Sequence, residues 1–155
     1  SRIRTTGKNQ QDVQRQTCYL EALETRSYLV THFGQFLEKP RTYGNCGAKW
    51  VGYEEKMTDV NIAVHMLTDA FADRFDLAIL VSGDSDLTTP LQTLREHFPT
   101  KRLIVAFPPG RKSAHLAKLA HGYLSIGETL LRQSQLPHQV SRKDGFTLAR
   151  PSAWR

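Results

Sequence analysis

The sequence predicts an α/β fold with a mainly parallel sheet, and three observations carry this prediction. Residues 77–81 (LAILV) form a short, continuous apolar run with β-branched members, which is typical of a strand buried on both faces. Residues 102–107 (RLIVAF) contain a second such run. Amphipathic segments at 58–73 and 87–98 follow the 3.6-residue period. This alternation of helix and strand indicates βα units and therefore a parallel sheet.

The remaining elements are predicted from local composition, in chain order. They are the end of a strand (1–8), a helix (10–26) that Asn9 can cap, a strand (28–37), a loop (40–49), a short strand (50–53), a helix (113–120), an edge strand (123–126) and a helix (128–134). The loop lacks the Gly-rich, Lys-Ser/Thr pattern of a phosphate loop. We expect one domain over residues 1–135, followed by a basic C-terminal tail over 136–155 that lies on the surface.

Composition places the chain among soluble globular proteins. Its 155 residues suit one domain with a real core, and 39% hydrophobic residues argue against wholesale disorder. No apolar run approaches the roughly 20 residues needed to cross a bilayer, and no signal peptide is visible. Cys18 and Cys46 show neither metal nor redox spacing. We therefore expect a cytoplasmic protein with reduced thiols and no membrane partner.

Charge is distributed unevenly along the chain. The net charge is +6, with −2 over residues 1–100 and +8 over residues 101–155. A basic C-terminal third beside acidic residues suits a polyanionic ligand that must approach carboxylates. A solvated surface with a basic tail explains the same numbers equally well.

Residues 82–86 (SGDSD) follow the 77–81 strand directly and place two carboxylates at its carboxyl end. In open α/β sheets, ligands bind at this end of the strands. The simplest interpretation is that Asp84 or Ser85 caps the following helix, for which one side-chain oxygen is enough. However, Asp84 and Asp86 are close enough to repel each other unless a cation or proton intervenes. Cation binding by these two aspartates is therefore an alternative interpretation to helix capping.

Other candidate residues have equally plain structural roles. Asp59 lies at the start of the 58–73 helix, where the helix dipole favours a carboxylate and capping is the preferred role from local sequence alone. Arg111 and Lys112 precede a predicted helix, and the N–H groups at the start of that helix could bind an anion. An ordinary loop that caps the helix explains the same residues equally well. His65 is interpreted as a packed or surface histidine.

Two motifs, residues 56–63 (KMTDVNIA) and 80–87 (LVSGDSDL), resemble those of NYN domains in the PIN-like nuclease superfamily, in particular the LabA-like branch. The resemblance covers nearly the whole chain and extends to residues 30–36 and to Pro151 and Trp154. Each motif alone is weak, but their order and spacing make a fairly specific pair.

The resemblance implies a three-layer α/β/α domain whose acidic cluster binds Mg²⁺ or Mn²⁺ and hydrolyses RNA, with single-stranded RNA favoured. It implies that Asp59, Asp84 and Asp86 are the catalytic and metal-binding residues. Hard divalent ions prefer such oxygen ligands. The expected substrate-binding residues are Lys56, Ser82, Arg111 and Lys112. A homo-oligomer is left open.

One departure from the family pattern gives rise to the alternatives. Family members begin with a strand that bears an Asp, and nothing like it occurs here, so we expect that the first strand and its carboxylate are missing. The runner-up is therefore a catalytically inactive RNA-binding or scaffold module of the same fold. A phosphotransferase with an Asp nucleophile is weaker, because no Asp-x-Asp follows a first strand with partnering Lys and Thr/Ser motifs.

Overall fold

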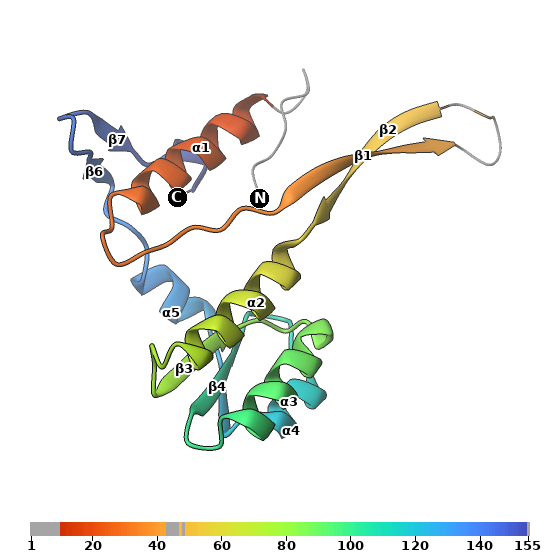
Figure 1. Ribbon diagram of the computed structural model, residues 1–155. Helices are drawn as coiled ribbons and strands as arrows, with labels where there is room; N and C mark the ends of the chain where they lie inside the picture. Colours follow the sequence, from red (N-terminus) through yellow and green to blue (C-terminus); the bar gives the residue numbers. More distant parts are fainter. Residues whose placement is uncertain (1–9, 43–46, 48, 155) are drawn as a thin grey trace. The chain divides into compact units, whose positions relative to one another are not determined.

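A computed structural model describes residues 10–42, 47 and 49–154. It divides into two compact units, one of residues 1–58 and 136–155 and the other of residues 59–135. Figure 1 shows the elements in chain order. They are α1 (Gln10–Glu24), β1 (Gln35–Thr42), β2 (Lys49–Lys56), α2 (Thr58–Phe71), β3 (Leu77–Val81), η1 (Ser85–Leu87), α3 (Thr88–His97), β4 (Arg102–Phe107), α4 (Ala114–Leu119), β5 (Gly122–Ser125), α5 (Glu128–Gln133), β6 (Gln139–Ser141), β7 (Thr147–Ala149) and η2 (Ser152–Trp154).

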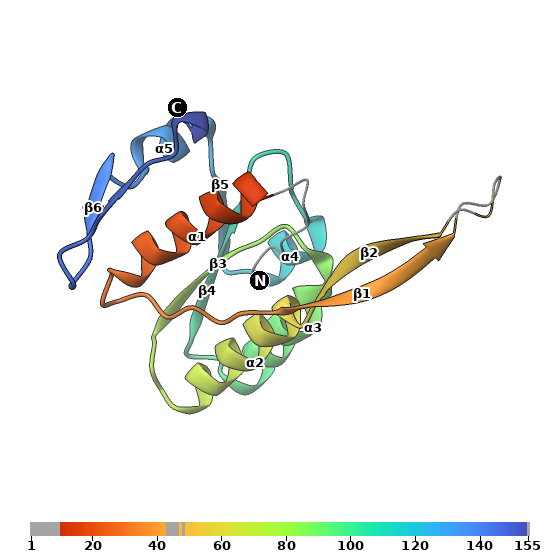
Figure 2. The ribbon, with the colours of Figure 1, turned by 90° about the horizontal axis from the view of Figure 1, so that it is seen from above.

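The 59–135 unit is built on a three-stranded parallel sheet in the order β3-β4-β5. Within it, α3 connects β3 to β4 and α4 connects β4 to β5 (Figure 2). Ile79 lies beside Ile104 in the β3–β4 register, and Ile104 lies beside Gly122 in the β4–β5 register. The predicted α/β class with a parallel sheet is confirmed.

The core of this unit lies between one face of the sheet and its helices. Because side chains alternate along a strand, Leu80, Leu103, Val105 and Phe107 fall on one face. They pack with residues of η1, α3 and α4 into one cluster of buried side chains, which α2 also contacts. The helical members of this cluster are Leu87, Leu91 and Leu116, with Ile62 and Met66 at its margin. Leu87 and Leu91 are positions that the 3.6-residue period of the 87–98 segment predicts.

The opposite face of the sheet is less covered. The side chains of Leu77, Ile79 and Val81 are 50%, 60% and 57% exposed. Among the described strands, β3 pairs with β4 alone and is therefore an edge of its sheet. No helix within the described ranges is long and apolar enough to span a bilayer.

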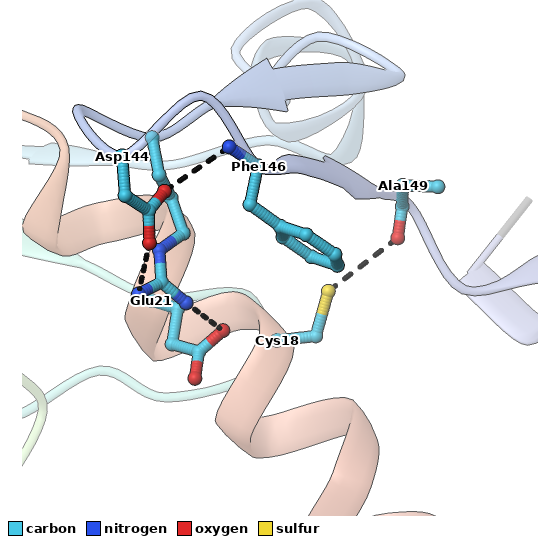
Figure 3. Close-up of polar contacts among 6 residues, drawn as sticks. Cys18, Glu21, Asp144, Phe146 and Ala149 are labelled. Carbon is cyan, nitrogen blue, oxygen red and sulfur yellow. Dashed lines mark hydrogen bonds and ion pairs between the residues drawn. The ribbon is translucent and has the colours of Figure 1, made fainter.

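The other unit packs the C-terminal residues against α1. The guanidinium of Arg142 binds Glu21 at 3.4 Å and Asp144 at 2.9 Å, and the Cys18 thiol donates to the Ala149 carbonyl at 3.4 Å (Figure 3). The tail predicted for residues 136–155 thus carries the β6–β7 hairpin, which α1 contacts.

The β1–β2 hairpin is the main difference from the predicted elements. Sequence patterning predicts a strand at 28–37 and a short strand at 50–53. The structure instead has no regular element at 28–34, and it pairs β1 with β2 in an eight-residue antiparallel register. Residues 28–34 have the side chains of a strand but no paired neighbour among the described residues, and a strand requires one. The predictions for residues 1–8, Asn9 and Cys46 lie outside the described residues.

Truncating a core leucine is expected to destabilise the 59–135 unit. Leu91→Ala removes a side chain that is fully buried, so it should lower the free energy of unfolding by about 2–5 kcal/mol. Leu130→Ala makes the same change on α5 at a side chain that is 51% exposed, and its effect should be well below that of Leu91→Ala. Urea denaturation of both variants measures the difference, and equal losses would contradict the assigned core.

The ion pairs of the β1–β2 hairpin predict an acid-sensitive contribution to stability. Lys39 and Lys56 each contact Glu54 at 3.0 Å, and together they lower the Glu54 pKa from 4.5 to about 2. Because the folded-state pKa is depressed, this contribution is fully present above about pH 4.5 and is lost as the pH falls towards 2. In an NMR titration, the pKa of Glu54 should be higher in Lys39→Met than in the parent chain. Lys49→Met, on the other face of the hairpin, should leave this pKa unchanged.

Candidate functional site at the carboxyl edge of the sheet

The loop that follows β3 is shaped by its own polar side chains. The Asp84 carboxylate accepts a hydrogen bond from the Asp86 N–H at 3.0 Å and caps η1, while the Asp84 N–H donates to the Ser82 hydroxyl at 3.1 Å. Asp84 and Asp86 are both exposed, within one turn of each other. Helix capping, one of the two roles that the sequence leaves open for Asp84, is thus present. It uses one carboxylate oxygen, and the charge and the second oxygen remain available.

The loop that follows β4 lies directly against the first loop. A methyl group built on Gly83 would stand 2.8 Å from the Arg111 Cβ and 3.2 Å from the Arg111 carbonyl. These distances are shorter than van der Waals contact, so only a residue without a side chain fits at position 83. Arg111 itself closes a turn by donating its N–H to the Pro108 carbonyl at 3.1 Å. Two acidic residues and an arginine therefore share one edge of the sheet.

Lys112 and Ser113 continue this second loop. The Lys112 ammonium lies 4.7 Å from the centroid of the Tyr123 ring on β5, a cation–π contact. The buried Ser113 hydroxyl accepts from the Leu116 N–H at 3.4 Å and caps α4, so the capped-loop interpretation is confirmed there. Sequence reasoning placed Tyr123 only in an edge strand. The missed signal is that parallel neighbours β4 and β5 bring their carboxyl ends to the same edge.

Two of the predicted site residues lie on other elements. Asp59 is exposed in the first turn of α2, where its charge suits the helix dipole. Lys56 ends β2 in the other unit and is ion-paired with Glu54. Across residues 10–42, 47 and 49–154, no three His, Cys, Asp or Glu side chains are grouped so as to hold a metal ion. A three-aspartate ligand set is therefore not assembled here, and the joint role of Asp59, Asp84 and Asp86 stays a prediction.

The donor chemistry nevertheless fits a weakly held hard cation. Mg²⁺ keeps several of its waters and is commonly bound through one or two carboxylates together with substrate phosphates. Asp84 and Asp86 supply two such carboxylates in one turn. The residues present thus fit a two-carboxylate site that a phosphate completes, and they do not fit a closed cage made by the protein alone.

The parallel sheet, with carboxylates and an arginine at its carboxyl edge, defines an α/β protein with a charged sheet edge. The chain belongs to the NYN domain family, whose model matches residues 1–127. This family has a PIN-like nuclease fold. The match does not distinguish the LabA-like branch, which stays a prediction.

Two individual proteins are similar to parts of the chain. The 6-hydroxy-3-succinoylpyridine 3-monooxygenase HspA of Pseudomonas putida is 32% identical over 108 residues, which is 65% of this chain and 33% of that protein. The chain thus spans about a third of the length of this curated relative. A crystal structure of a protein of unknown function from Vibrio parahaemolyticus superimposes with a TM-score of 0.48 at 21% identity, over 81% of this chain and 65% of that one.

The close approach of the two loops predicts a strong effect of a small substitution. Gly83→Ala should force the loops apart and lower the free energy of unfolding by about 1–3 kcal/mol, because its methyl group meets Arg111 at 2.8 Å. Gly127→Ala is the matched control, since nothing lies within 4 Å of its added methyl group. Thermal unfolding of both variants compares the two sites, and an unaffected Gly83→Ala would disprove the contact.

Proposed function

We propose that this chain hydrolyses phosphodiester bonds in RNA, preferentially single-stranded RNA, in a reaction that depends on Mg²⁺ or Mn²⁺. The observation that carries the proposal is the pair of carboxylates at the end of β3, with the Arg111 loop packed against it. Membership of a family with a PIN-like nuclease fold supports the same chemistry.

Each predicted site residue has a proposed role. Asp84 and Asp86 would hold the metal, with Asp59 as a third acidic residue. A bound divalent ion lowers the pKa of a water molecule and neutralises charge on the phosphoryl oxygens. Arg111 and Lys112 would bind flanking phosphates, and Ser82 would also contact the substrate. The Ser82 hydroxyl accepts a hydrogen bond from the Asp84 N–H as well, which shapes the loop. Lys56 is proposed as a further phosphate contact.

Two alternative functions can be distinguished from a nuclease by experiment. A non-catalytic RNA-binding or scaffold module would retain RNA without cutting it, and its affinity would fall steeply with salt. The 32% identity to a protein named as a pyridine monooxygenase favours a third candidate, hydroxylation of an aromatic ring. That candidate predicts consumption of 6-hydroxy-3-succinoylpyridine that depends on dioxygen and a two-electron reductant.

The cellular setting belongs to the same proposal. We place the protein in the cytoplasm, where the free thiol of Cys18 stays reduced. A homo-oligomer is compatible with the proposal and is tested by light scattering of the purified chain.

Asp84→Asn provides the sharpest test of the nuclease proposal. Asparagine caps a helix as well as aspartate does, so the variant keeps the bond to the Asp86 N–H and loses only the charge. Cleavage of a fluorescent single-stranded RNA in Mn²⁺ or Mg²⁺ should fall by roughly a hundredfold or more, and EDTA should abolish it in the parent chain. Asp86→Asn should behave like Asp84→Asn.

Asp69→Asn is the control, because it removes a carboxylate of α2 that is ion-paired with Arg74 at 2.8 Å, away from the loop after β3. Its cleavage rate should match the parent. If Asp84→Asn cleaves as fast as Asp69→Asn, Asp84 is only a cap and the nuclease site proposed here is wrong. Asp59→Asn measures separately whether the third acidic residue contributes.

A further inference from the structure

The β1–β2 hairpin is a two-stranded ribbon with distinct faces. Its register pairs Leu37 with Glu54, Lys39 with Gly52 and Arg41 with Trp50. Neither strand pairs with another strand among the described residues, so the ribbon has two strands only. Because side chains alternate along a strand, paired residues share a face.

The two faces differ in charge and in aromatic content. What we term the Trp50 face consists of Gln35, Leu37, Lys39, Arg41, Trp50, Gly52, Glu54 and Lys56. The opposite, Tyr53 face consists of Phe36, Glu38, Pro40, Thr42, Lys49, Val51, Tyr53 and Glu55. The Trp50 face thus carries three cationic side chains against one carboxylate, whereas the Tyr53 face carries one against two. Positive charge is concentrated on the side that presents tryptophan.

Arg41 and Trp50 are in cation–π contact on this face, and we term this pair the platform. The Arg41 guanidinium carbon lies 5.4 Å from the centroid of the Trp50 ring, and Trp50 is 46% exposed. Both side chains lie over Gly52, where an added methyl group would meet Arg41 Nε at 3.2 Å and Trp50 Cζ3 at 3.3 Å. Among the described residues, no carboxylate pairs with Arg41. Its N–H groups are therefore available to an external anion.

Two lysines extend the positive charge along the same face. Lys39 and Lys56 share the single carboxylate of Glu54, each at 3.0 Å. The three groups together retain a positive charge, since two ammonium groups meet one carboxylate. The hairpin therefore presents a row of cations that leads to an exposed aromatic platform.

We propose that the Trp50 face binds single-stranded nucleic acid, with a base stacked on Trp50 and Arg41 and phosphates bound by Lys39, Lys56 and Arg41. Aromatic rings interleaved with cations bind single strands in this way, because unstacked bases expose a flat face and every nucleotide carries a phosphate. A duplex keeps its bases stacked and offers none to the platform. This inference rests on the proposed function for its ligand class, and it assigns a binding surface outside the sheet edge.

Fluorescence anisotropy of a labelled single-stranded RNA oligonucleotide tests the proposal. The full chain is used in EDTA, so that cleavage is suppressed. Trp50→Ala should weaken binding about tenfold or more, and Trp50→Phe should retain most of the affinity, because a phenyl ring still offers a stacking surface. Tyr53→Ala is the matched control, since it removes an aromatic ring from the opposite face of the same hairpin. Its affinity should stay within about twofold of the parent.

A second pair of variants tests the phosphate contacts. Arg41→Gln should lower the slope of log affinity against log salt by about 0.7, the value for one phosphate contact on a single strand. Lys49→Gln removes the same charge from the Tyr53 face and should leave this slope unchanged.

Equal effects of Trp50→Ala and Tyr53→Ala, or equally tight binding of a duplex of the same sequence, would overturn the inference. Its failure is distinguishable from failure of the nuclease proposal. Loss of cleavage in Asp84→Asn with undiminished Trp50-dependent binding supports both sites. Trp50-dependent binding by a chain that never cleaves supports the hairpin site alone.

Discussion

The parallel pairing of β3 with β4 is the constraint on which the candidate site depends. Leu77 lies beside Arg102 and Val81 lies beside Ala106, so both strands run in one direction and end at the same edge. The loops that follow them can therefore touch, as Gly83 and Arg111 do. In an antiparallel pair, the loop after β4 would emerge about 15 Å away, at the other end of a five-residue strand. Acidic and basic side chains share an edge only because of this direction.

The amino edge of the same sheet fixes that register. The Arg102 N–H donates to the Asp76 carbonyl at 2.8 Å, and the backbone N–H of His121 donates to the Leu103 carbonyl at 2.8 Å. The His121 imidazole in turn accepts from the Leu103 N–H at 3.1 Å. A one-residue slip would break these bonds and turn Leu103 out of the core. The geometry of the carboxyl edge is therefore held in part from the far end of the strands.

A buried lysine joins the same set of contacts. Lys101 is 6% exposed, its ammonium contacts the Asp73 carboxylate, and this partner lowers the Asp73 pKa. The ammonium also lies 5.5 Å from the centroid of the Phe75 ring. The turn between α2 and β3 is thereby joined to the start of β4, which sequence patterning does not reveal, because lysine is ordinarily exposed.

Sequence predicts this protein well where local periodicity determines the structure. The sequence predicts the strands at 77–81 and 102–107 to the residue, because each contains one apolar run that ends at turn-forming residues. The β1–β2 hairpin was missed because the partner of a strand is chosen by pairing over distance, and residues 28–34 show that β-rich sequence alone does not make a strand. At the site, the Asp84 and Asp86 loop follows from the sequence. Its contact with Arg111 does not, since that contact depends on strand direction and register.

Local structure does not account for two charges in the loop after β3. Asp84 caps η1 through one oxygen, a task that asparagine performs equally well. The Asp86 carboxylate has no hydrogen-bond partner among the described residues, so its charge serves no contact within them. Two carboxylates held in one turn repel each other, and the cap that fixes Asp84 keeps them near. A loop built for stability alone would gain by losing one charge. The arrangement therefore favours a positively charged ligand from outside the chain, which relieves this repulsion when it binds.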